Sequence, residues 1–107
     1  MKLTLTELNE QLVKLGYPVA YYQFKSAKEP PFIVYLVLNS DTFNADNVVL
    51  TESVYVDIEL YVTNKSLAIE DKIKNMLKEN ELSWSYDEIY IEDERVFKCT
   101  FSTKLIN

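Results

Sequence analysis

The spacing of apolar and polar positions along the chain predicts two helices. Leucines recur at intervals of three and four over residues 4–15, which places them on one face of an amphipathic helix. Thr4 and Glu7 have the spacing of a capping box at its start, and Gly16 suits the left-handed residue that ends many helices. A second apolar stripe at helical spacing predicts another helix over residues 67–80.

The remaining patterned segments predict strands. They cover residues 17–24, 32–38, 54–62, 83–92 and 95–105, and residues 48–53 form either a short separate strand or the first part of a longer one. We expect an α+β fold with a mainly antiparallel sheet of about four to six strands and two helices packed on one face. The expected order is α-β-β-β-(β)-α-β-β. A length of 107 residues suits a single domain over residues 1–107.

The strand over residues 32–38 is apolar on both faces. Its two sets of side chains are Phe32, Val34, Leu36 and Leu38 on one side, and Ile33, Tyr35 and Val37 on the other. In a sheet with one solvated face, one of these sets would be polar. We expect the helices to cover one face and a neighbouring subunit to cover part of the face of Ile33, Tyr35 and Val37. The alternative is that the chain's own loops and hairpins cover it.

Residues 39–47 are predicted to form a turn-rich polar loop. Phe43 is the one large apolar residue among polar neighbours, so we expect it to anchor a contact with a neighbouring subunit or another protein. The residues expected at this contact are Asp41, Thr42, Phe43 and Asn44. A calcium-binding loop that starts at Asp41 is disfavoured because Phe43 and Ala45 replace the oxygen ligands it needs. We expect no metal site.

Two carboxylates project from one face of the strand over residues 54–62. Asp57 and Glu59 lie between Tyr55 and Tyr61 on its polar face. A pair at this spacing is one option for acid–base chemistry, but a solvated strand face accounts for it as well. The sequence contains no histidine, one cysteine and one glycine, which removes the commonest general base, thiolate clusters and glycine-rich phosphate loops. We therefore expect no catalytic residues and no cofactor.

Charge and composition narrow the range of partners. The chain has 11 basic and 17 acidic residues, a net charge of −6, so specific nucleic-acid binding is not expected. The tyrosines are not interleaved with Lys or Arg, which disfavours stacking on single strands. No apolar run approaches the roughly 18 residues of a membrane span, and we expect no membrane contact. The lone Cys99 falls on the apolar face of the last strand and is predicted to be a core residue.

Four short motifs resemble one protein family. They are PVAY at Pro18–Tyr21, PPFIVY at Pro30–Tyr35, F-x-A-D-N at Phe43–Asn47 and IELYV at Ile58–Val62. Together with the short helix and last hairpin that follow them, these motifs make the resemblance cover most of the chain in order and spacing. The sequence resembles the small tail terminator, tail completion or head–tail joining proteins of long-tailed bacteriophages and prophages of Gram-positive bacteria.

The resemblance implies a structural function in the virion. Proteins of this family assemble into a ring, commonly a hexamer, that caps the tail tube and joins it to the connector on the head side. The implied partners are other copies of the chain, the major tail tube protein and the connector protein. DNA would pass through the ring, with Asp57 and Glu59 as possible lumen-facing acids. The implied location is the tail or neck of the virion, after assembly in the cytoplasm of the host bacterium.

Two other classes are compatible with a small acidic chain of this composition. One is a non-catalytic phage-encoded binding module that inhibits a host protein. The other is a small ligand-binding α+β domain, which needs an apolar pocket with convergent polar groups.

Overall fold

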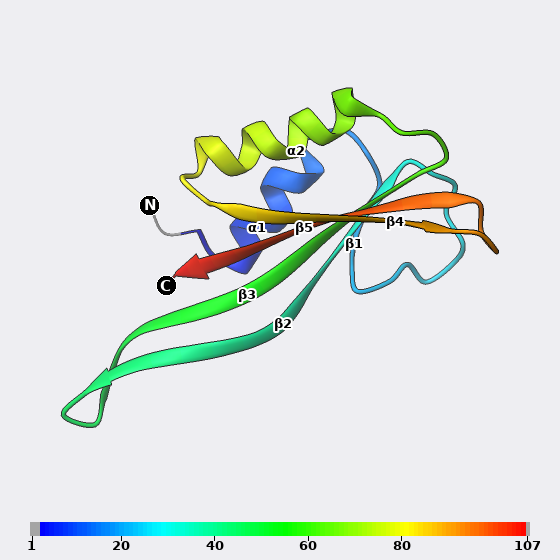
Figure 1. The fold of residues 1–107 in the computed structure, drawn as a ribbon. Helices are drawn as coiled ribbons and strands as arrows, with labels where there is room; N and C mark the ends of the chain where they lie inside the picture. Colours follow the sequence, from blue (N-terminus) through cyan, green and yellow to red (C-terminus); the bar gives the residue numbers. More distant parts are fainter. Residues whose placement is uncertain (1–2, 107) are drawn as a thin grey trace.

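Five strands form one mixed sheet, and two helices cover one of its faces (Figure 1). The elements follow the order α-β-β-β-α-β-β along the chain. The computed structural model describes residues 3–106. The elements are α1 (Leu5–Val13), β1 (Val19–Tyr21), β2 (Phe32–Ala45), β3 (Val48–Val62), α2 (Leu67–Glu79), β4 (Trp84–Ile91) and β5 (Val96–Ile106). The strand order is β1-β2-β3-β5-β4, with β1 parallel to β2 and the other pairs antiparallel. The predicted α+β class and element order are confirmed.

Capping residues mark the start of both helices, and a glycine follows the end of α1. The Thr4 hydroxyl accepts the Glu7 N–H at 3.1 Å, and the Glu7 carboxylate accepts the Thr4 N–H at 3.0 Å, so the capping box is complete. Gly16 has φ of +99° after α1, a conformation that a residue with a Cβ rarely adopts. The Ser66 hydroxyl caps α2 by accepting the Ile69 N–H. Within residues 3–106, neither helix is long and apolar enough to span a membrane.

Both helices pack on the same face of the sheet, and the core lies between the two layers (Figure 1). Alternate residues of β3 point into this core, as the period of two predicted. The fully buried side chains from the two layers include Leu8, Leu12, Ile58, Leu60, Ile73, Leu77, Cys99 and Phe101. Cys99 is therefore a core residue, as predicted.

The expected subunit contact through Ile33, Tyr35 and Val37 is wrong. Ile33 is fully buried and Tyr35 is 7% exposed, and both belong to the core beneath the helices. The Tyr35 hydroxyl donates a hydrogen bond to the Asn9 Oδ1 of α1 at 2.9 Å, while Val37 packs at the margin of the same core. Because both faces of this strand are apolar, alternation alone could not identify the face that the helices cover.

The opposite face of the sheet, called here the open face, is partly covered by the chain itself. The connection over residues 22–31 runs below the sheet, away from the helices (Figure 1). Its Phe24 ring meets Phe32 edge to face at 5.4 Å between centroids, and Phe32 stacks on Tyr61 at 4.8 Å. Val34 is 5% exposed, whereas Leu38, further along β2, is 56% exposed. The chain's own connection thus covers the open face only along the first half of β2.

The predicted loop over residues 39–47 is mostly strand. β2 continues to Ala45 and pairs with β3 from Val48, so a two-residue turn, Asp46–Asn47, closes a long hairpin. Asp46 and Asn47 have φ of 52° and 65°, the left-handed values of a type I′ hairpin turn, which Asp and Asn tolerate better than most residues.

Candidate functional site

The far half of the β2–β3 hairpin projects from the sheet as a two-stranded arm, defined here as residues 39–52 (Figure 1). β5 pairs with β3 only from Ser53 onward, and β1 pairs with β2 only from Ile33 to Tyr35. Within residues 3–106, no further strand pairs with the arm, so both of its backbone edges are open. Open edges and a projecting shape are typical of segments that pair with another chain.

Apolar side chains gather at the end of the arm. Phe43, Val48, Val49 and Leu50 are each more than half exposed, with Phe43 the most exposed at 64%. Several large apolar side chains exposed together at the end of a projecting element are typical of a contact surface. The arm also carries Asp41, Asp46 and Glu52 and no Lys or Arg, so its surface combines apolar and acidic groups.

Strand register divides the four residues predicted at the contact between two faces. Asp41 pairs with Ser53 and Phe43 pairs with Thr51, which places Asp41 and Phe43 on the continuation of the open face. Thr42 and Asn44 alternate with them and lie on the other face. All four side chains are exposed. The arm thus presents a phenyl ring and a carboxylate side by side.

A groove of about 510 Å³ lies between the connection over residues 22–31 and the open face. Its apolar surface comes from Phe24, Phe32, Val34, Tyr61 and Val96. Two exposed cations, Lys25 and Lys28, belong to its wall, and Glu94 stands among the lining residues from the β4–β5 turn. The Lys28 ammonium lies 5.9 Å from the centre of the Phe24 ring, a cation–π distance. The groove is aromatic inside and mainly cationic at its rim.

Asp57 and Glu59 lie on the open face with partners from β5 and β3. The Ser102 hydroxyl donates to Asp57 Oδ1 at 2.5 Å. Glu59 accepts a hydrogen bond from the Tyr61 hydroxyl at 3.0 Å and pairs with the Lys98 ammonium at 3.4 Å. The two carboxylates are half-buried, and the charge of Glu59 is offset by Lys98. The arrangement ties neighbouring strands together.

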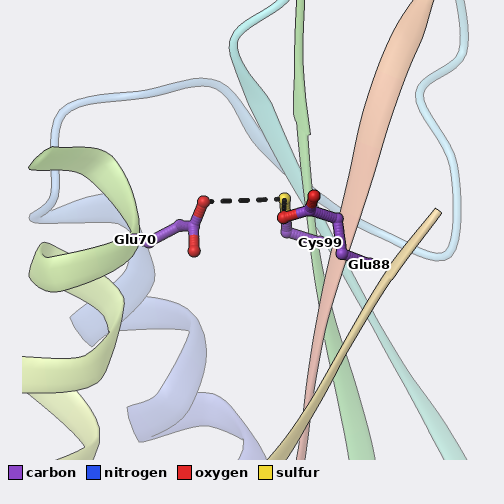
Figure 2. Close-up of side chains that lie close together, drawn as sticks. All are labelled: Glu70, Glu88 and Cys99. Carbon is purple, nitrogen blue, oxygen red and sulfur yellow. Dashed lines mark hydrogen bonds between the residues drawn. The ribbon is translucent and has the colours of Figure 1, made fainter. Parts of the chain in front are cut away.

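A separate cluster of ionisable groups lies between α2 and the last two strands (Figure 2). Glu70 Oε2 and Glu88 Oε1 each lie 3.9 Å from the Cys99 sulfur. The Lys65 ammonium contacts Glu88 Oε1 and both oxygens of Glu70, the latter at 2.9 and 3.2 Å. The Tyr86 hydroxyl donates to Glu88 Oε1 at 2.6 Å. Sequence patterns did not reveal this cluster because its members come from four separate segments.

The cluster has the donor types of a metal site, but the ammonium of one lysine already pairs with both of its carboxylates. Glu70 is 1% exposed, and a buried carboxylate needs a partner, which the Lys65 ammonium provides. Burial raises the pKa of the Cys99 thiol, so it stays protonated and is a poor metal ligand at neutral pH. Hydrogen bonds from Lys65 and Tyr86 lower the pKa of Glu88. The arrangement acts as an ion-pair network that fixes α2 to the sheet.

Known protein families and curated proteins supply no match to this chain. The relation to tail terminator proteins therefore stays a prediction from the short motifs.

The sequence pattern correctly predicted that Phe43 lies outside the core, but it did not predict the arm that carries Phe43. The signal was present in Asp46–Asn47, two residues suited to a type I′ turn, followed by the β-favouring run Val48–Leu50. The sequence contained no comparable signal for the groove. It arises where the connection over residues 22–31 folds across β2, β3 and β5, a placement that depends on tertiary packing.

Proposed function

We propose that this protein is a structural subunit of a phage tail that assembles into a ring, caps the tail tube and joins it to the head-side connector. The observation that carries the proposal is the arm over residues 39–52, with open backbone edges and apolar side chains at its end. The resemblance of the four short motifs to tail terminator proteins is the basis for the proposed identity of the assembly.

The energetics of the arm favour a partner. Phe43, Val48, Val49 and Leu50 expose more than half of their surface in the monomer. Full burial of such side chains contributes about 1.5–3 kcal/mol each, before the costs of association are subtracted. Two-stranded hairpins are also marginal by themselves in water, so contact with another subunit would stabilise the arm.

The charge of the protein suits a passage for DNA better than a binding site for it. The net charge of −6 disfavours the binding of phosphates, and salt screens this repulsion beyond a Debye length, roughly 8 Å at physiological ionic strength. Lys98 offsets Glu59, and Ser102 hydrogen-bonds Asp57, so the repulsion we propose comes from the whole acidic surface.

Shortening the arm tests the proposal. Deletion of Thr42–Asn44 together with Val49–Glu52 keeps the Ala45–Val48 turn pair and restores pairing of Asp41 with Ser53. The removed residues lie outside the segment that β5 pairs, so we expect the thermal unfolding midpoint to change by no more than a few degrees. Ring formation should be lost, as judged by negative-stain electron microscopy of the protein alone and of tail tubes mixed with it.

Two results would contradict the proposed function. One is a shortened variant that still forms rings and caps tubes. The other is an intact protein that neither self-assembles nor binds tail tubes but captures one host protein in a stable complex, which would favour the inhibitor class. Leu67→Ala is a control for the loss of an exposed apolar side chain outside the arm, because Leu67 on α2 is 64% exposed, and this variant should still form rings.

A further inference from the structure

The end of the arm and the groove lie at opposite ends of an elongated molecule. The protein measures 51 Å along its longest axis and 26 and 22 Å across. Phe32 in the groove and Phe43 on the arm are eleven positions apart on one strand, which corresponds to about 36 Å at 3.3 Å per residue. Phe43 therefore cannot reach the groove of its own chain.

We propose that the groove receives the arm of a second copy of this chain, with Phe43 packed against the cluster of Phe24, Phe32 and Tyr61 and Asp41 beside Lys25 and Lys28. This contact specifies how the subunits of the proposed ring meet, and it rests on the proposed function.

Two properties of the groove match the arm. The first is aromatic chemistry: a phenyl ring that enters beside Phe24 and Phe32 extends the edge-to-face and stacked contacts already present there. Phe43 is the largest exposed apolar side chain on the arm, and the volume of about 510 Å³ accommodates it with neighbouring residues. Central aromatic anchors of this kind carry most of the binding energy at protein interfaces.

The second property is charge. The arm carries three acidic residues and no basic ones, and Lys25 and Lys28 are exposed at the rim of the groove. Asp41 lies two residues before Phe43 on the same strand face, so its carboxylate is about 7 Å along the strand from the anchor and can face a rim lysine. Glu94, from the β4–β5 turn, also lines the groove, and its repulsion of a carboxylate favours the orientation that points Asp41 toward the lysines.

The symmetry of this contact determines what it builds. The surfaces that meet are different, so each copy uses its arm on one neighbour and its groove on the other. Head-to-tail contacts of this type close into rings or continue as filaments, whereas a two-fold contact stops at a dimer. The proposed contact can therefore build a ring without any second interface, provided that the rotation between neighbours closes.

Two variants test the contact, and each of them disrupts only one of its two surfaces. Phe43→Ala removes the anchor and keeps the groove, while Lys25→Glu with Lys28→Glu reverses the rim and keeps the arm. All three positions are solvent-accessible, so both variants should fold. We expect each variant alone to be monomeric in sedimentation velocity and a 1:1 mixture to form dimers, because one intact arm meets one intact groove. We expect Phe43→Ala to raise Kd by roughly 30-fold or more, as loss of a central anchor does.

Exchanging the charges of the arm and the groove provides a second test of the contact. Adding Asp41→Lys to the double lysine reversal restores opposite charges, and self-assembly should return. Lys14→Glu with Lys104→Glu is the matched control, because it changes the net charge equally at two exposed lysines away from the groove. This control should assemble like the unaltered protein.

Three results would overturn the docking proposal. In the first, the lysine-reversed variant assembles like the unaltered protein, which would show that the arm docks elsewhere, for example against another arm. In the second, the 1:1 mixture remains monomeric although the unaltered protein forms rings. In the third, the unaltered protein and the mixture are monomeric up to about 1 mM, where a contact of millimolar Kd is half occupied. Rings, or capped tail tubes, in any of these cases would leave the proposed function standing.

Discussion

Ile33 and Tyr35 lie in the core because of what flanks β2, not because of their own apolar character. Phe32 and Val34 are equally apolar, yet they face the aromatic connection over residues 22–31. The parallel pairing of β1 with Ile33–Tyr35 holds this part of β2 under α1, where Asn9 accepts the Tyr35 hydroxyl. The elements packed on each side of β2 determine which of its faces joins the core. The alternation of residues along the strand carries no information about these neighbours.

Alanine substitutions at two isoleucines test whether Ile33 is a core residue. Ile33 is fully buried and Ile89, on the edge strand β4, is 46% exposed. Ile33→Ala should lower the free energy of unfolding by about 2–5 kcal/mol through lost burial and a residual cavity. Ile89→Ala should lower it by about 1 kcal/mol or less. Urea titration measures both, and equal small effects would show that Ile33 is not a core residue.

The Lys65 network predicts a pH dependence of stability. Hydrogen bonds from Lys65 and Tyr86 hold the pKa of Glu88 below its ordinary value of 4.5 in the folded protein. Because the folded pKa is the lower one, the stabilisation is present above pH 4.5 and is lost as the pH falls below it. Glu88→Gln should cost about 0.5–1 kcal/mol at pH 7, since the pair is partly exposed, and nothing at acid pH.

Urea titrations of both proteins from about pH 7 to pH 3 measure this difference. A constant gap between Glu88→Gln and the unaltered protein over that range would contradict the assignment. Lys65→Met serves as the comparison and should be more destabilising at neutral pH than Glu88→Gln. It removes the partner of Glu70, which is 1% exposed, and leaves a buried carboxylate uncompensated.

Among the elements, the helices could be predicted most closely and the arm least. Thr4, Glu7 and Gly16 are local signals, and they define α1 without reference to the rest of the fold. The arm combines polar residues typical of a loop with a register that only its partner strand fixes. Pairing with Val48–Ser53 keeps residues 39–45 extended, so the tertiary partner overrides their weak strand propensity.

An extra residue lies at the base of the arm. Val37 pairs with Val56 and Asn39 pairs with Tyr55, which leaves Leu38 as a bulge. Bulges bend a strand and increase its twist, so Leu38 sets the direction in which the arm leaves the sheet. Deletion of Leu38 joins the two registers directly and should preserve the fold, with a change in unfolding free energy of about 1 kcal/mol or less because Leu38 is 56% exposed.

Deletion of Leu38 should nevertheless change the assembly. In the proposed ring, the direction of the arm fixes the angle between neighbours, and roughly 10° separates a six-membered ring from one with five or seven subunits. We expect rings of altered diameter, or open filaments, in negative-stain images. Rings of unchanged diameter would show that the bulge does not set this angle.

At the scale of the whole molecule, the arm makes the protein less compact than its length requires. The radius of gyration is 14.9 Å, against about 13 Å expected for a compact chain of 107 residues. The sequence predicted one α+β domain and a non-core Phe43, because composition and periodicity carry that information. It could not predict the elongated shape, which depends on the direction in which the hairpin projects. It also could not predict the groove, which depends on how the connection over residues 22–31 packs against the sheet.

The open backbone edges of the arm also bear on solubility. An exposed two-stranded ribbon with apolar side chains is a template on which identical chains can stack as cross-β fibrils. Asp41, Asp46 and Glu52 oppose this, because in-register stacking would bring like carboxylates together in every layer. The acids of the arm thus oppose fibril formation, and their repulsion is strongest at neutral pH and low salt.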